Sequence, residues 1–207
     1  MRALILAGGD LTLTLALKNL EADLVIAADG GLRHASALGL EPDLIIGDFD
    51  SATPEDLAAF AHVPRQQFPT AKAELDLELA LGHALRAGAT DLRVLGALGG
   101  RFDQSLAAVL IAARYARGGT RVSLHSGEQS VYALPPGQTC YNLPVNTLFS
   151  LLSLEATKLS LVGAHYDLEH APLAFGVGLG VSNRVRTSPL QVTVHEGLCV
   201  LVVEYGE

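Results

Sequence analysis

The segment DLIIGDFDS, residues Asp43–Ser51, decides how the rest of the chain is interpreted. Residues 44–46 form a short apolar run of Leu and Ile, which is typical of a buried strand. Gly47 ends this run, and two aspartates follow it at once. If strand geometry continues past the glycine, Asp48 and Asp50 point to the same side, because side chains alternate along a strand. Neighbouring carboxylates repel each other unless a cation lies between them, so the segment predicts a divalent metal site.

Short apolar runs alternate with helical patterns through the first 125 residues or so. Strands are expected at Ala3–Ala7, Asp23–Ala28, residues 44–46, Leu92–Leu95 and Arg121–His125. Helices are expected at Leu11–Leu20, at Arg33–Leu38, from Thr53-Pro54 onward, at Leu77–Leu85 and at Ser105–Arg117. This alternation predicts an α/β domain with a mainly parallel sheet and right-handed crossovers, in a Rossmann-like arrangement of three layers.

The pattern changes near Val131–Gly137, and no long helical segment follows. Short alternating runs separated by Gly and Pro predict an antiparallel all-β sandwich. Its strands are expected at Leu148–Leu154, Lys158–Val162, Leu173–Phe175, Gln191–His195 and Val200–Tyr205. We therefore expect two domains, residues 1–134 and residues 135–207, with the boundary at Pro135-Pro136.

The composition limits the classes of partner. A net charge of −8, from 14 Lys and Arg against 22 Asp and Glu, argues against nucleic-acid and anionic-membrane binding. ATP stays compatible with this charge, because Mg²⁺ screens its phosphates. Cys140 and Cys199 are far apart and form no CxxC, so we expect reduced core residues. Without a visible signal peptide or an apolar run long enough to cross a bilayer, a cytoplasmic protein is expected.

Acidic residues stand at the expected strand ends and helix starts. They are Asp29, the pair Asp48 and Asp50, Asp76 and Asp103. Because the strands of a parallel sheet end at one edge, these side chains can converge although they are distant in sequence. Carboxylates clustered without His or Cys suit Mg²⁺ better than Zn²⁺. Asp is also common in turns and at helix N-caps, and for Asp29 and Asp103 that alternative stays open.

A phosphate site is expected beside these acids. Arg101 offers a forked donor, and Gly99-Gly100 before it let backbone amides approach a ligand closely. Lys72 adds a point charge. The P-loop pattern GxxxxGK[ST], a full GxGxxG, GxSxG and HExxH are all absent from the sequence.

These motifs together resemble the thiamin pyrophosphokinase family. The resemblance covers most of the chain, and GDFDS followed by GGRxD is its most specific part. The pieces are AADGG (Ala27–Gly31), PDLIIGDFDS (Pro42–Ser51), K-x-E-x-D-x-E-x-A-L (Lys72–Leu81), GALGGRFD (Gly96–Asp103), Tyr166-x-Leu168, Leu173-x-Phe175-Gly176 and GVSN (Gly180–Asn183).

The resemblance implies transfer of a pyrophosphoryl group from ATP to the hydroxyl of thiamine, with Mg²⁺ as cofactor and AMP as leaving group. It implies a homodimer with the active site at the subunit interface. The catalytic and metal set it implies is Asp48, Asp50, Asp76 and Asp103, with Arg101 on the phosphates. Nucleotide contacts are expected from Asp29, Gly30, Lys72, Gly99, Gly100 and Gln104, and thiamine contacts from Tyr166, Ser182 and Asn183.

Three positions depart from the family pattern: Ala73, Leu75 and Gln104 stand where an acid, a threonine and a histidine are usual. Two alternatives therefore stay open. One is a related pyrophosphokinase that acts on another hydroxymethyl heterocycle, such as a pterin. The other is a non-catalytic protein that binds thiamine or a nucleotide.

Overall fold

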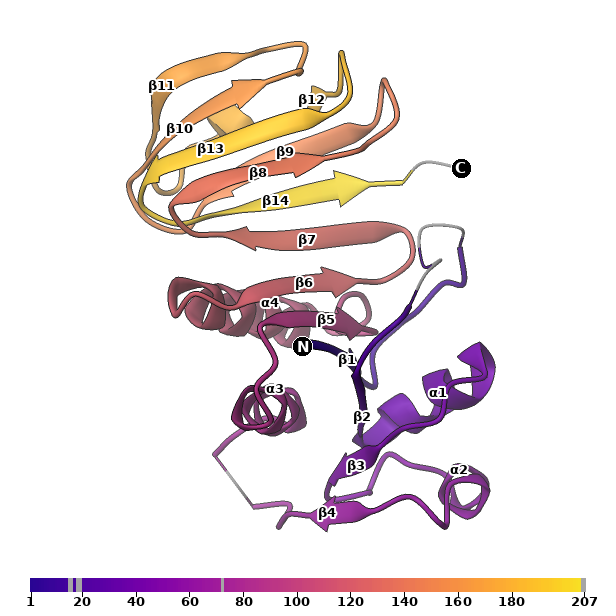
Figure 1. The fold of residues 1–207 in the computed structure, drawn as a ribbon. Helices are drawn as coiled ribbons and strands as arrows, with labels where there is room; N and C mark the ends of the chain where they lie inside the picture. Colours follow the sequence, from indigo (N-terminus) through magenta and orange to yellow (C-terminus); the bar gives the residue numbers. More distant parts are fainter. Residues whose placement is uncertain (15–16, 18–19, 72, 206–207) are drawn as a thin grey trace.

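A ten-stranded sheet runs through most of the molecule (Figure 1). The structure is a computed structural model and describes residues 1–14, 17, 20–71 and 73–205. The first part of the sheet is parallel, as the sequence predicts. In spatial order its strands are β4 (Arg65–Gln67), β3 (Leu44–Gly47), β2 (Leu24–Ala28), β1 (Arg2–Leu6), β5 (Asp91–Leu95) and β6 (Arg121–His125).

The sheet does not end at β6, and the expectation of a mainly parallel sheet is met only in part. A tight turn at residues 126–128 reverses the chain, and four antiparallel strands continue the same sheet. They are β7 (Gln129–Leu134), β14 (Cys199–Glu204), β9 (Leu148–Ser153) and β12 (Asn183–Arg184). The sheet is therefore mixed. The division of the chain at residue 135 stays a prediction.

Helices cover both faces of the parallel part, which gives it the expected three layers (Figure 1). The helices α3 (Asp76–Arg86) and α4 (Phe102–Arg117) pack on one face, and α1 (Leu32–Leu38) packs on the other. Alternate residues of β1 divide accordingly: Ala3 and Ile5 join the core under α3 and α4, whereas Leu4 and Leu6 join the core under α1. The short helix α2 (Pro54–Ala59) lies next to α1.

A second, all-antiparallel sheet packs on the antiparallel part of the large one and encloses a separate core. That core combines Phe149 and Leu201 from the large sheet with Leu159 and Val192 from the second. The second sheet contains β11 (Leu168–Leu173), β10 (Thr157–Val162), β13 (Leu190–Glu196) and the edge strand β8 (Gly137–Tyr141). The expected all-β region is thus present, but three of the seven strands described after residue 135 belong to the large sheet.

Several local signals are confirmed. The Thr53 hydroxyl caps α2 by accepting a hydrogen bond of 3.1 Å from the Asp56 N–H, and Pro54 is the first helical residue. Gly39 ends α1 in the left-handed conformation, with φ 64°. Among the described residues, no helix is both long and apolar enough to cross a membrane.

Other local expectations need correction. The helix expected over residues 11–20 is not seen at 11–14 or at 20, and positions 15, 16, 18 and 19 lie outside the described residues. The strand expected at Leu173–Phe175 is instead the end of β11, because the chain turns after Leu173 and Gly176 takes a left-handed φ of 76°. Cys199 is buried as expected, but Cys140 is exposed because it lies on the edge strand β8.

One close approach fixes the entry into α1. Gly31 ends the 3-10 turn η2 (Asp29–Gly31), and a Cβ atom added to it would lie 1.9 Å from the carbonyl oxygen of Leu6. Its φ of −64° is available to every residue, so the requirement for glycine is purely steric. The contact packs the turn after β2 against the end of β1.

Gly31→Ala is therefore expected to destabilise the protein by roughly 3 kcal/mol or more, because the methyl group meets rigid backbone. Gly178→Ala is the matched control, since Gly178 lies in the 3-10 turn η3 (Gly178–Gly180) with open space around its Cβ position. Denaturant unfolding of both variants measures the difference. Equal stabilities would contradict the tight packing of the turn.

Candidate metal and phosphate site

Three carboxylates meet where β2 and β3 end. Asp29 follows β2 directly, and Asp48 and Asp50 follow β3, its parallel neighbour in the sheet. One carboxylate oxygen from each residue lies within 4.8 Å of the others. Oxygens on opposite sides of one Mg²⁺ are about 4 Å apart, because each Mg–O distance is about 2.1 Å. The group therefore has nearly the spacing that a single hard cation needs.

Asp48 and Asp50 converge through a turn, and not through the continued strand geometry that the sequence suggested. Phe49 between them has a left-handed φ of 67°, which ends the alternation of side chains. The Asp50 N–H donates to Asp48 Oδ1 at 3.3 Å, and the Ser51 hydroxyl donates to Asp50 Oδ1 at 2.9 Å. Phe49 packs against the core under α1, which anchors the turn.

Asp29 is the most buried member of the group, with 9% of its surface exposed. Burial raises the pKa of its carboxyl above the usual range; hydrogen bonds from Ser51 and Gly30 oppose the rise, and the nearby Asp76 carboxylate adds to it. Its Oδ1 atom accepts no hydrogen bond from the residues that the structure describes. A cation would stabilise a carboxylate oxygen that is buried, lacks a hydrogen bond and lies near another carboxylate.

The three acids line a cavity of about 470 Å³. Asp76, the first residue of α3, lines it from another side, and so does Gln104 in the first turn of α4. The remaining walls include glycine-rich loops after β1 (Gly8, Gly9) and β5 (Gly96, Gly99). This volume is in the range of small-ligand and cofactor sites, and the walls combine negative charge with backbone that a ligand can approach closely.

The structure brings together seven of the residues that the sequence selected: Asp29, Gly30, Asp48, Asp50, Asp76, Gly99 and Gln104. Lys72 lies outside the described residues. Arg101, Asp103 and Gly100 are near in sequence but are not among the residues that line the cavity.

Arg101 and Asp103 instead pair with each other. The guanidinium donates to Asp103 through Nε at 3.1 Å and through Nη2 at 2.6 Å, and both side chains are exposed. This contact holds the pKa of the Asp103 carboxyl below its usual range.

Sequence reasoning missed part of the lining. Gly8 and Gly9 follow β1 at the same sheet edge as the aspartates, and Thr70 and Glu74 come from the segment before α3. The signal for the glycines was present, because they end the first apolar run of the chain. Arg33 holds their loop by donating to the Gly8 and Gly9 carbonyl oxygens.

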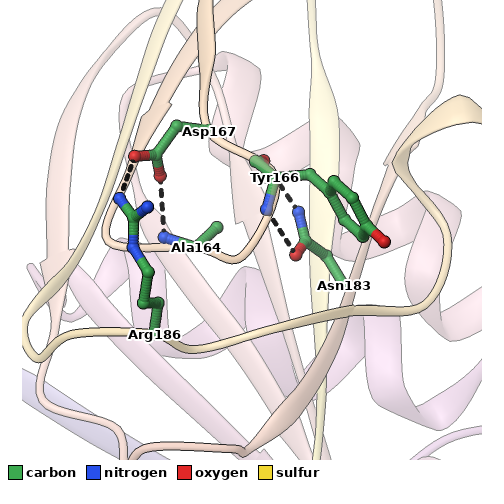
Figure 2. Close-up of polar contacts among 5 residues, drawn as sticks. All are labelled: Ala164, Tyr166, Asp167, Asn183 and Arg186. Carbon is green, nitrogen blue, oxygen red and sulfur yellow. Dashed lines mark hydrogen bonds and ion pairs between the residues drawn. The ribbon is translucent and has the colours of Figure 1, made fainter.

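The residues expected to contact thiamine lie elsewhere. Tyr166 and Asn183 are adjacent to each other (Figure 2). Ser182 precedes Asn183 and has a left-handed φ of 62°. Asn183 lies on β12, seven strand positions from β2 in the sheet. At about 4.8 Å per strand, that separation is on the order of 30 Å. Within one chain, this region and the carboxylates therefore do not share a cavity.

Two family models match successive parts of the chain. The family model described as thiamin pyrophosphokinase, catalytic domain, matches residues 16–124, and the vitamin B1 binding domain of the same family matches residues 141–199. The thiamine pyrophosphokinase of Bacillus subtilis is 26% identical over 88% of this chain and 87% of its own length. Thiamin pyrophosphokinase 1 of Caenorhabditis elegans is 28% identical over 71% of this chain and 64% of its own.

Solved structures support the fold. The crystal structure of thiamine pyrophosphokinase from Bacillus subtilis superposes over 100% of both chains with a TM-score of 0.89 at 24% identity. Yeast thiamin pyrophosphokinase gives a TM-score of 0.75 at 17% identity, over 98% of this chain and 86% of its own. Because the catalytic-domain model alone matches more than half of the 207 residues, and the binding-domain model follows it in order, the chain belongs to the thiamin pyrophosphokinase family.

Proposed function

We propose that this chain is a thiamine diphosphokinase, which transfers a pyrophosphoryl group from ATP to the hydroxyl of thiamine and releases AMP. Its membership of the family supports the reaction. The observation that carries the proposal is the group of Asp29, Asp48 and Asp50 at the edge of a cavity that Asp76 also lines. Transfer of a highly charged group requires charge neutralisation and alignment more than covalent catalysis, and such a site provides both.

Mg²⁺ is the cofactor that these donors fit. The ligand atoms are all hard oxygens. Asp29 Oδ1, which is buried without a hydrogen bond from the described residues, would be one of them. Asp29, Asp48 and Asp50 would hold the ion. When bound, it would neutralise charge on the triphosphate. We assign Asp76 to the same centre from its place at the cavity wall.

The glycine loops and α3 position the nucleotide in this proposal. Gly30 and Gly99 carry no side chain that would keep phosphate oxygens from the backbone. Gln104 lines the wall and both donates and accepts hydrogen bonds. Lys72, Gly100, Arg101 and Asp103 keep their expected roles as proposals. For Arg101 and Asp103, these roles require their mutual ion pair to open.

The acceptor side of the site is proposed to come from a second copy of the chain. Tyr166 exposes 74% of its surface, and its ring face suits a thiazolium cation. Tyr166, Ser182 and Asn183 are far from the carboxylates of their own chain, as the strand order indicates. A homodimer with the site between subunits removes this separation. The cytoplasm, which supplies ATP and Mg²⁺, is the compartment that we propose.

Metal binding is tested by heating the protein with and without Mg²⁺. At a free Mg²⁺ concentration of about 100 times its Kd, we expect the wild-type Tm to rise by roughly 5 °C or more, because the ion binds only the folded state. Asp29→Asn should raise the Tm of the metal-free protein, since it removes a buried charge, and should lose most of the Mg²⁺ effect.

Glu21→Gln is the control, because its side chain is 82% exposed and lies outside the group. A full Mg²⁺ shift in Asp29→Asn would contradict the assignment. Asp103→Asn tests whether Asp103 is also a metal ligand. Loss of the Mg²⁺-induced rise in Tm would add Asp103 to the ligands, and an unchanged rise would leave only the other carboxylates.

Activity is tested by incubating the pure protein with ATP, Mg²⁺ and thiamine, and following thiamine diphosphate and AMP. Asp48→Asn and Asp50→Asn should each lower kcat by about 10²-fold or more while the protein stays folded, because each removes charge stabilisation at the phosphates. Near-normal turnover in both variants would overturn the site. Product from a hydroxymethyl pterin but not from thiamine would favour the related pyrophosphokinase. Thiamine binding without turnover would favour a binding protein.

A shared site is tested by mixing two variants at a thiamine concentration far below the raised KM of Tyr166→Ala, so that each variant alone gives little turnover. Asp48→Asn damages the metal side and Tyr166→Ala the acceptor side, so a mixed dimer contains one intact site. We expect a mixture that has exchanged subunits to regain up to about one quarter of wild-type activity, from random pairing of two kinds of chain. If exchange is demonstrated by mass spectrometry and activity stays absent, the site belongs to one chain.

A further inference from the structure

We propose that Asp167, Arg186 and Asn183 are positioning residues that hold the Tyr166 loop, so that the exposed tyrosine ring is ordered before thiamine arrives. This inference rests on the proposed function. It assigns a role to Asp167 and Arg186, and it changes the role of Asn183 from a substrate contact to a support for Tyr166.

The side-chain amide of Asn183 forms two hydrogen bonds with the backbone of Tyr166 (Figure 2). Its Oδ1 accepts from the Tyr166 N–H at 3.2 Å, and its Nδ2 donates to the Tyr166 carbonyl oxygen at 2.9 Å. The same Oδ1 accepts from the Arg184 N–H at 2.8 Å. Asn183 is buried, with 9% of its surface exposed. These contacts resemble the backbone pairing of a neighbouring strand. Because they occupy the amide oxygen and one amide N–H, the side chain has little hydrogen-bonding capacity left for a ligand.

Asp167 holds the other side of the loop. Its Oδ1 accepts from the Ala164 N–H at 2.8 Å, which closes the turn before Tyr166. Its Oδ2 accepts from the Arg186 guanidinium at 2.5 Å (Figure 2). One carboxylate thus joins the turn to the segment that follows β12.

Backbone hydrogen bonds run parallel to these side-chain contacts. The His165 N–H donates to Arg184 O at 2.9 Å, and the Arg186 N–H donates to Gly163 O at 2.7 Å. Ala164 and Val185 between them form a β-bridge, and both are fully buried. The residues on both sides of Tyr166 thus have hydrogen-bond partners in neighbouring segments. The ring itself projects away from the Asp167–Arg186 pair and is exposed (Figure 2).

We expect these contacts to affect ligand binding more than the stability of the fold. An ion pair with side chains 53% and 38% exposed contributes little to the stability of a whole domain. An ordered loop, however, removes part of the entropy cost that a ligand must otherwise meet when it orders its contact residues. The contacts should therefore influence the KM for thiamine much more than Tm.

The test compares Asp167→Ala with wild type in the assay described above. We expect the KM for thiamine to rise about tenfold, with kcat and the KM for ATP within about twofold of wild type. Asp167→Asn should fall between the two, because it keeps an acceptor for the Ala164 N–H and loses the charge. Glu155→Ala is the matched control: it removes the exposed Arg117–Glu155 ion pair of 2.5 Å between α4 and the turn after β9.

A double-mutant cycle separates positioning from a general structural effect. Tyr166→Ala should itself raise the KM for thiamine, and in that background Asp167→Ala should add less than about twofold. Amide exchange reports the loop directly: protection of the Ala164 amide should fall in Asp167→Ala, and protection of the Tyr166 amide should fall in Asn183→Ala.

The outcomes distinguish this inference from the proposed function. The positioning role is overturned by any of three results. These are a KM for thiamine in Asp167→Ala equal to that in Glu155→Ala, additive effects of Asp167→Ala and Tyr166→Ala on this KM, or unchanged amide protection. Without product from wild type, the proposed function fails, and calorimetry with thiamine alone then decides the inference. A roughly tenfold weaker affinity in Asp167→Ala would support it, and equal affinity or no binding by wild type would overturn it.

Discussion

Mutual repulsion among carboxylates at the end of β2 and β3 is the constraint around which the catalytic half of this protein is built. Asp29, Asp48 and Asp50 approach within 4.8 Å of one another, and Asp76 is close enough to add to the raised pKa of Asp29. Nothing in folding favours such a group in the absence of a cation. The surrounding structure keeps it together through rigid packing: Gly31 pressed on Leu6, Phe49 anchored in the core, and the sheet hydrogen bonds of two neighbouring strands.

The two halves of the chain are connected more closely than a linker between domains would allow. The large sheet continues from parallel to antiparallel at β6–β7, and α4 covers that junction. Val122 on β6, Val131 on β7 and Val200 on β14 all share one core with α4. The N-terminus of the same helix carries Asp103 and Gln104, beside the cavity. The helix whose first turn borders the cavity is thus also the one that joins the two kinds of sheet.

Much of this was accessible from the sequence, for identifiable reasons. Five of the parallel strands and the helices α1 to α4 have strong local signals, such as the Thr53 cap and Gly39, whereas the three-residue strand β4 was not predicted. The convergence of Asp29, Asp48, Asp50 and Asp76 follows from the rule that parallel strands end at one edge. The continuation of the sheet past β7 could not be read locally, because that pairing is set by a distant partner, β14. The pairing of Arg101 with Asp103 was missed because both were assigned to a ligand separately.

The departures from the family pattern remove one acid, at Ala73, and change hydrogen bonding, but they leave the group of Asp29, Asp48 and Asp50 unchanged. Leu75 is the N-cap of α3 and has no side-chain acceptor. Its own N–H nevertheless donates to Glu78 Oε2 at 3.2 Å. The Arg114 guanidinium in turn donates to Glu78 Oε1 at 2.8 Å. The start of α3, and with it the position of Asp76, is therefore maintained without the usual hydroxyl. Gln104 still lines the cavity with a donor and an acceptor. Charge neutralisation is the larger demand of pyrophosphoryl transfer. In the proposed site, Asp29, Asp48, Asp50 and Asp76 would still meet it, although the chain lacks one acid at position 73, one hydroxyl and one imidazole.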